Sequence, residues 1–356
     1  MKYSFKNDYS SIAHPLVLKK LLECQEEQNV GYGLDKHSLN AKGLIQEKIK
    51  RNSEVYFLAG GTQANMVVIS SLLRPYEAVI CCESGHINVH ETGAVEGQGH
   101  KCLTAAGKNG KLTPEDIVYV LNKHTDCHMV RPKMVYISNA TEVGTVYSRD
   151  ELKELYKCCQ KNNLYLFLDG ARLASAMAAS DFTYKDLGAY TDIFYIGGTK
   201  NGGYLGEAVV INTPALSAEF DYCVKHFGAM LAKGFVAGIV FEVLMKDDLY
   251  LEIGRKENEC AAALTKGLAD MGYSFLTESK TNQIFPIVDE KTMEYLAKEY
   301  LFEIWEYKNK EEIVIRLVTS FATELEDCGK FLNYLQGMNE NIRSVSYTHL
   351  RAHETG

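Results

Sequence analysis

Short apolar runs alternate with amphipathic segments from about residue 53 to residue 212. Two amphipathic segments begin with helix-start signals, because Pro114 follows Thr113 and because Ser148 and Glu151 have capping-box spacing. Such alternation is typical of a mostly parallel sheet covered by helices on both faces, so we predict an α/β fold. The runs predicted as buried strands are 55–58, 78–81, 133–137, 164–168 and 192–196.

The pattern changes after about residue 213 and predicts a second, smaller α+β domain. The segment 214–271 is typical of long helices, and the apolar runs 283–288 and 313–318 predict short strands. Two more helices are expected at about 291–300 and 324–336. An N-terminal arm without a strand of its own is expected to pack on this smaller domain. The predicted divisions are the arm at 1–45, a large domain at 46–245 and a small domain at 246–338.

The composition excludes several classes of protein. Hydrophobic residues make up 46% of the 356 residues and charged residues 24%, which indicates a folded globular chain. No apolar run approaches the roughly 18 residues of a membrane span, so we expect no membrane protein. The formal net charge of −8 repels nucleic-acid phosphates, so we expect no nucleic-acid partner.

The cysteines and the chain ends bear on the compartment. The ten cysteines include no C-x-x-C spacing, so we expect buried free thiols in a reducing compartment, the cytoplasm. The first ten residues lack the apolar segment of a secretory signal. The last stretch, 344–356, does not fit the rest of the pattern, and we interpret it as a non-native tail.

A lysine flanked by glycines follows the last predicted strand of the large domain. Lys200 stands in the sequence Ile-Gly-Gly-Thr-Lys-Asn-Gly-Gly, and α/β folds place ligands at such strand ends. A buried lysine with a lowered pKa is suited to Schiff-base chemistry with a carbonyl group. The alternative is a flexible hairpin that carries a solvated lysine.

An aspartate ends another predicted strand. Asp169 follows a very apolar run and is separated from Arg172 by Gly and Ala. A carboxylate in this position is costly to bury unless it meets a cation. The protonated ring nitrogen of pyridoxal phosphate would be such a cation. The alternative is an ion pair between Asp169 and Arg172.

Two further segments suit the rest of such a cofactor. Gly61 and Thr62 stand between a strand and a helix, where backbone N–H groups hold phosphate, although an ordinary N-capped turn is the alternative. His86 follows the strand 78–81, where its ring could stack on a planar cofactor; it and His90 could equally be capping or core histidines. We expect no metal at this pair, because no further ligands stand nearby. Neither a Walker loop nor a dinucleotide fingerprint occurs.

Together these four elements meet the needs of pyridoxal phosphate. On them, over about residues 5–336, the chain resembles the low-specificity L-threonine aldolase family, within the aromatic amino acid β-eliminating lyase group of fold-type-I enzymes. The resemblance implies an aspartate aminotransferase-like large domain with a smaller C-terminal domain. The segments that carry it are Gly61-Thr-Gln-Ala-Asn, Gly85-His86 with Glu91-Thr-Gly, Asp169-Gly-Ala-Arg172, Thr199-Lys200-Asn201 and Arg316-Leu-Val-Thr.

The resemblance implies a role for each of these residues. Lys200 takes the Schiff-base role, His86 stacks on the cofactor ring, and Asp169 holds the ring nitrogen. Gly61 and Thr62 bind the phosphate. The residues implied at the substrate are Arg172 and Arg316 on its carboxylate, with Asn7 and Tyr32 lining the site near a subunit interface.

Two positions depart from the family pattern. Glu142 stands where the family has a histidine near the substrate hydroxyl, and it could transfer the proton if burial raises its pKa. His86 and His90 are the other candidate bases. Lys233 stands in a loop, 225–233, where the family supplies an arginine toward the phosphate of a neighbouring subunit.

The implied activity is cleavage of the Cα–Cβ bond of a β-hydroxy amino acid such as L-threonine, giving glycine and an aldehyde. The implied assembly is a homodimer or homotetramer. Within the same cofactor class, β-elimination or racemisation of another small amino acid is the alternative. From another class, a non-catalytic phosphate-binding protein would need no covalent chemistry at Lys200.

Overall fold

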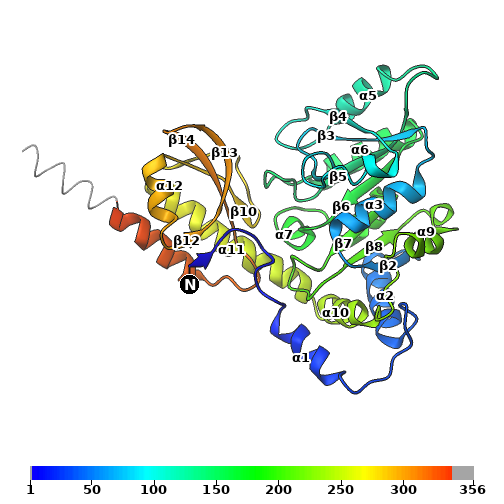
Figure 1. Ribbon diagram of the computed structural model, residues 1–356, viewed down its shortest axis with the longest axis horizontal. Coiled ribbons are helices and arrows are strands. Elements are labelled where there is room, and N and C mark those ends of the chain that lie inside the picture. The colour runs from blue at the N-terminus through cyan, green and yellow to red at the C-terminus, as the bar shows by residue number, and fades with distance from the viewer. Residues whose placement is uncertain (1, 339–356) are drawn as a thin grey trace, which may run out of the picture.

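The computed structural model describes residues 2–338 and contains two lobes, each with its own sheet (Figure 1). The large lobe is built on seven strands and the small lobe on five. The predicted tail at 344–356 lies outside the described residues. Within residues 2–338, no helix is both long and apolar enough to cross a membrane.

The large sheet is parallel except for one strand. β8 pairs antiparallel with both of its neighbours, and the other pairs are parallel. The sheet thus matches the predicted mostly parallel α/β fold. In spatial order the strands are β2 (Glu54–Leu58), β8 (Glu207–Ile211), β7 (Ile193–Gly197), β6 (Tyr165–Asp169), β5 (Arg131–Ser138), β3 (Glu77–Cys82) and β4 (Cys102–Ala105).

Helices cover both faces of this sheet, because successive strand residues point to opposite faces and both sets are apolar. On β6, for example, Leu166 and Leu168 join one core while Phe167 joins the other. The first core is closed by α2 (Lys36–Ile49), α5 (Pro114–Asn122), α6 (Arg149–Lys161), α7 (Leu173–Ala178), α8 (Tyr184–Tyr190) and α10 (Phe235–Met245). The second is closed by α3 (Gly61–Leu72), α4 (His86–Val89) and α9 (Phe220–His226).

The small lobe packs an antiparallel sheet on helices. Its core joins the sheet to α11 (Leu249–Asp270), α12 (Glu290–Leu296) and a last helix over 325–338. Two short 3₁₀ turns in the large lobe complete the elements, η1 (Glu96–Gln98) and η2 (Pro214–Leu216). The strands of the small lobe are β9 (Ser274–Phe275), β10 (Gln283–Ile284), β11 (Pro286–Val288), β13 (Glu303–Asn309) and β14 (Glu312–Val318).

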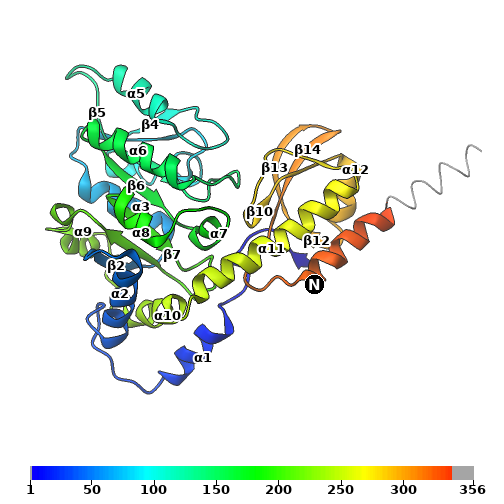
Figure 2. The ribbon, with the colours of Figure 1, turned by 180° about the vertical axis from the view of Figure 1, so that it is seen from behind.

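The N-terminal arm differs from the expectation in two ways. It does have a strand, since β1 (Tyr3–Ser4) pairs in parallel with β12 (Tyr300–Leu301) on the small lobe. The rest of the arm lies on the large lobe, where α1 (Pro15–Glu23) and α2 pack against α10 (Figure 2). The reason is the sequence of α10, whose apolar residues surround the helix and need cover on more than one side.

The helix α11 joins the lobes. In both views it runs from the large lobe, near α10, along the small lobe (Figures 1 and 2). It crosses α7 at Gly254, where a Cβ would lie 2.2 Å from the carbonyl oxygen of Ala174. Cys260, Leu264 and Leu268 farther along the same helix belong to the core of the small lobe. The two lobes therefore meet through a backbone-to-backbone contact.

Candidate active site

A cavity of about 320 Å³ lies at the carboxyl ends of β5, β6 and β7, beside the start of α3. Its volume falls within the rough range of 300–1000 Å³ for ligand pockets. Seven residues singled out from the sequence line it: Gly61, Thr62, His86, Glu142, Asp169, Arg172 and Lys200. The other lining residues include Tyr9, Asn65, Ser138, Tyr195, Thr199 and Glu207.

Lys200 lies in the turn between β7 and β8. The side-chain amide of Asn201 fixes this turn by donating to the carbonyl oxygens of Gly197 at 2.8 Å and Ala171 at 2.9 Å. Burial lowers the pKa of Lys200 below its ordinary value, and the positive charge of Arg172 adds to this effect. The turn is therefore not a flexible hairpin with a solvated lysine, and the lysine is shifted toward its neutral, nucleophilic form.

Asp169 ends β6 and is 4% exposed. Its Oδ1 accepts hydrogen bonds from the backbone N–H of Ala171 at 3.0 Å and from the hydroxyl of Tyr195. Its Oδ2 accepts from Asn65 Nδ2 at 3.1 Å and from the hydroxyl of Tyr136 at 2.6 Å. All four donors are neutral, and no residue between 2 and 338 forms an ion pair with this carboxylate. A buried carboxylate that borders a cavity and has no ion-pair partner suits a positively charged atom of a ligand.

Arg172 pairs with the N-terminal arm instead of with Asp169. Its Nε and Nη2 donate to the two carboxylate oxygens of Asp8 at 2.6 and 3.1 Å. Asn282 of the small lobe donates to Asp8 at 2.9 Å, so three distant segments meet at this ion pair. Burial alone would raise the pKa of Asp8, but the charges of Arg172 and Lys200 hold it below its ordinary value. The Nη1 of Arg172 is not used in this pair.

A chain of hydrogen bonds connects His86 with Glu142. Glu142 Oε1 accepts from the backbone N–H of His86 at 3.0 Å and from the hydroxyl of Ser138 at 2.6 Å. The Nδ1 of His86 lies 2.7 Å from the buried carboxylate of Glu91, which also accepts from Asn65. Burial raises the pKa of Glu142 although the Ser138 hydroxyl opposes the shift; the negative charge of Asp169 adds to it.

The remaining predicted site residues do not line this cavity. Arg316 forms an ion pair with Glu303, and its buried Nε has no hydrogen-bond partner among the described residues. Asn7 only receives local hydrogen bonds, from Tyr9 and Ser10. Tyr32 is 52% exposed and contacts Lys225, and neither it nor Lys233 lines the cavity. His90, a candidate base, also lies outside the lining.

Sequence reasoning missed two residues at the site that have clear physical features. Glu207, at the start of β8, lines the cavity and accepts from the backbone N–H of Gly198 at 3.0 Å and from Thr199 at 2.9 Å. Burial raises its pKa to about 8, although the Thr199 hydroxyl and the charge of Lys200 oppose the shift. Trp305 of β13 lies between the ring of His90, at 6.1 Å, and the guanidinium of Arg316, at 5.2 Å. Neither residue belongs to a recognisable sequence motif, so the sequence pattern did not single them out.

The arrangement of sheet, cavity and lobes is the fold-type-I architecture of pyridoxal phosphate-dependent enzymes. A variant aspartate aminotransferase of Thermus thermophilus shares this fold with a TM-score of 0.68 at 13% identity, covering 94% of this chain and 90% of that one. A model of the beta-eliminating lyase family matches residues 18–291. This chain therefore belongs to the beta-eliminating lyase family of enzymes.

Two relatives are more similar to the chain. The low specificity L-threonine aldolase of Pseudomonas aeruginosa is 33% identical over 326 residues, which cover 90% of this chain and 93% of the relative. A solved structure of Leishmania major threonine aldolase is 44% identical with a TM-score of 0.93, covering 94% of this chain and 99% of that one. The resemblance to aldolases predicted from the motifs is thus confirmed over nearly the whole chain.

Proposed function

We propose that this protein is a pyridoxal phosphate-dependent lyase that cleaves the Cα–Cβ bond of a β-hydroxy amino acid such as L-threonine, giving glycine and an aldehyde. The observation that carries the proposal is one cavity lined by the half-buried Lys200 and by Asp169, whose buried carboxylate lacks a cation. The aldolase relatives support the choice of substrate.

The residues of the cavity fit this cofactor at four points. Asp169 would accept a hydrogen bond from the protonated ring nitrogen, and Lys200 would bond to the aldehyde carbon. Gly61 and Thr62 lie in the first turn of α3, whose N-cap residue makes no side-chain hydrogen bond, so backbone N–H groups remain for the phosphate. His86 lines the same cavity and would stack on the ring. When bound, the cofactor supplies an electron sink for the charge that develops at Cα.

Two arginines are proposed to bind the substrate carboxylate. Asp8 takes the Nε–H group and one Nη2–H group of Arg172, so three N–H groups, two on Nη1 and one on Nη2, remain for a carboxylate. Arg316 has a buried, unpartnered Nε, which a carboxylate would satisfy. We propose that both arginines act together, with Asp8 setting the position of Arg172.

Glu142 is proposed to accept the proton of the substrate hydroxyl. Its two hydrogen bonds are both made by Oε1, so Oε2 remains for the substrate. Because its pKa is raised, the ionised form that accepts a proton accumulates only as the pH rises through that raised value.

Replacing Glu142 with Gln is expected to lower kcat by about 10²- to 10⁴-fold and to remove the rise of kcat with pH on the acidic side. The measurement is the pH profile of aldehyde release by the Glu142→Gln variant and the wild-type protein. Glu83→Gln, a change of an exposed acid that directly follows the neighbouring strand β3, is the control and should keep the profile. An unchanged acidic limb in Glu142→Gln would assign the base to His86 or His90 instead.

The reaction itself is tested by offering several substrates to the purified protein with pyridoxal phosphate. Release of an aldehyde from L-threonine or L-allo-threonine, with glycine formed in equal amount, is the expected result. Pyruvate from cysteine or serine without aldehyde release would instead support β-elimination, and loss of optical activity from alanine would support racemisation. Either outcome would overturn the proposed carbon–carbon cleavage, but the assignment of pyridoxal phosphate as the cofactor would stand.

We also propose that the protein works as a homodimer or homotetramer in the cytoplasm. A surface hollow is lined by Tyr32, Tyr222 and Met230 with Asp221 and Lys225, and Tyr222 is 80% exposed. Such a surface suits a second copy of the chain, which would bring Tyr32 and Lys233 toward a neighbouring cavity. All ten cysteines are unpaired, which supports a reducing compartment. Light scattering of the purified protein measures the assembly, and a monomer would contradict it.

A further inference from the structure

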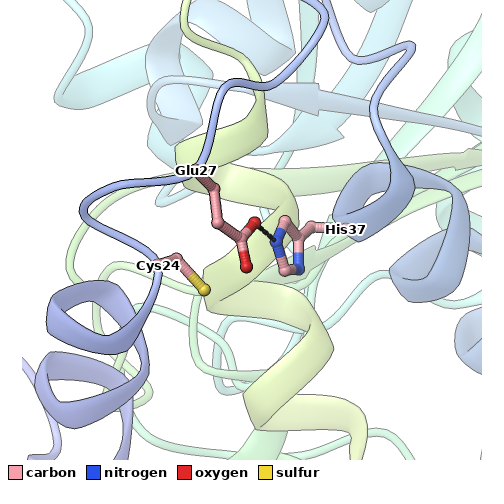
Figure 3. A group of neighbouring side chains, drawn as sticks. All are labelled: Cys24, Glu27 and His37. Atoms are coloured by element: carbon pink, nitrogen blue, oxygen red, sulfur yellow. Dashed lines mark hydrogen bonds and ion pairs between the residues drawn. The ribbon is translucent and has the colours of Figure 1, made fainter.

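Three side chains with metal-binding atoms converge outside the active site (Figure 3). Cys24 is the C-cap residue of α1, Glu27 lies in the turn that follows, and His37 is the second residue of α2. The Cys24 Sγ, a Glu27 carboxylate oxygen and a His37 ring nitrogen all lie within 4.8 Å of one another. We propose that these three residues bind one zinc ion, which joins the end of α1 and the segment after it to the start of α2.

The spacing of the three atoms is close to that of a zinc site. Zinc binds sulfur at about 2.3 Å and nitrogen or oxygen at about 2.0–2.2 Å, which puts ligand atoms of a tetrahedron roughly 3.3–3.7 Å apart. His37 Nε2 and Glu27 Oε2 are now 2.7 Å apart, so an ion would need them to separate by roughly 0.6 Å. A side-chain rotation of Glu27 provides this, because the glutamate is only partly buried.

A second carboxylate orients the histidine as it does in many zinc sites. The Nδ1 of His37 lies 2.6 Å from Glu242 Oε2 on α10, and Asn40 Nδ2 donates to the other oxygen of Glu242 at 3.2 Å. With its proton on Nδ1, the ring presents the lone pair of Nε2 toward Glu27 and Cys24. The side chain of His37 is 4% exposed, so this orientation is held by packing as well as by hydrogen bonds.

The chemistry of the set favours zinc over harder cations. One thiolate, one imidazole and one carboxylate are typical zinc ligands, whereas magnesium and calcium take oxygen ligands. A thiolate and a carboxylate balance the charge of a divalent ion, and the Cys24 proton leaves to solvent when the Zn–S bond forms. Lys36 Nζ now lies 3.1 Å from Glu27 Oε2, but its side chain is 62% exposed and can turn into solvent. A water molecule would complete the tetrahedron.

The sequence did not point to this site, because C-x-x-E followed ten residues later by His is not a recognised metal-binding spacing. The competing interpretation is a buried imidazolium, with His37 donating one proton to Glu27 and the other to Glu242. The two interpretations differ in what they predict for zinc and for the thiol.

The test uses the full-length protein, stripped with a chelator and titrated with zinc in the presence of a competing indicator. The wild-type protein is expected to hold one zinc equivalent that survives desalting, as measured by mass spectrometry of the metal. Cys24→Ser removes the sulfur and leaves both His37 hydrogen bonds in place, so it should fold and bind zinc at least about 10-fold more weakly. Cys127→Ser, which removes an exposed thiol elsewhere, is the matched control and should bind as the wild type does.

Glu242→Gln probes the orientation of His37 without removing a ligand. Its zinc affinity is expected to fall about 10- to 100-fold, and cobalt bound in place of zinc should keep its thiolate-to-metal absorption. If the wild-type protein retains no more zinc than Cys24→Ser, the proposal is wrong and His37 serves as an imidazolium. This result would leave the proposed lyase activity untouched, because none of the three residues lines the active-site cavity.

Discussion

A Lys200→Ala variant should lose aldehyde release from L-threonine by at least about 10³-fold, because no other lysine among residues 2–338 lines the cavity. Burial and the charge of Arg172 lower the pKa of Lys200, which favours the neutral amine needed for this bond. Initial rates at saturating cofactor measure the loss. Borohydride reduction of the wild-type protein followed by peptide mapping should place a pyridoxyl group on Lys200.

The control for this variant is Lys308→Ala, which removes an exposed lysine of the small lobe and should keep wild-type rates. A Lys200→Ala protein that turns over normally would refute the assignment of the lysine. An adduct on a different lysine would refute it as well, while leaving the cofactor in place.

Replacing Asp169 with Asn should lower kcat by about 10²-fold or more and weaken cofactor binding, because the amide no longer stabilises a protonated ring nitrogen. The side chain keeps its size, and the amide oxygen can still accept the hydrogen bond from the backbone of Ala171. The amide nitrogen then stands where Oδ2 accepted from Asn65, so that hydrogen bond is lost. The rate is measured together with the affinity for pyridoxal phosphate, by titrating the stripped protein.

A matched control is Asp192, which directly precedes the neighbouring strand β7. Asp192 is also a buried aspartate, but it accepts hydrogen bonds from Leu166 and Thr213 and does not line the cavity. Asp192→Asn therefore serves as a control for loss of stability. Its kcat per folded molecule should equal that of the wild type. Equal kinetics of Asp169→Asn and wild type would remove the proposed role of Asp169.

The large sheet could be predicted from the sequence because its central strands are buried on both faces and form continuous apolar runs. The strands that were not predicted are β1, β4, β8, β9, β12 and β13, and three of them have a clear physical reason. β4 has only four residues. β8 directly follows the glycine-rich segment around Lys200, which was interpreted as a ligand-binding loop without a strand after it. β13 reads Glu-Ile-Trp-Glu-Tyr-Lys-Asn and is mostly exposed, so its polar residues hid it. The segment 214–271 contains α9, α10 and α11 instead of long helices throughout.

Much of the site could be predicted because Asp169 and Lys200 each stand in a local motif at a strand end. The partners of these residues could not, since they come from distant parts of the chain. Asp8 reaches Arg172 across 164 positions of sequence, and only tertiary packing makes that pair. Tyr136 and Tyr195 look like ordinary core residues of their strands until the structure shows both hydroxyls on the Asp169 carboxylate.

The crossing of α11 over α7 is a close contact between the backbones of the two lobes. At Gly254 the two backbones lie so close that even a methyl group would overlap Ala174, so the angle between the two helices is set at this contact. From Gly254 the helix extends for 16 further residues, or about 24 Å, to Asp270. A change of about 10° in the angle at the crossing would displace the far end by about 4 Å, so a larger residue at Gly254 is expected to disturb packing of the small lobe far from the substitution.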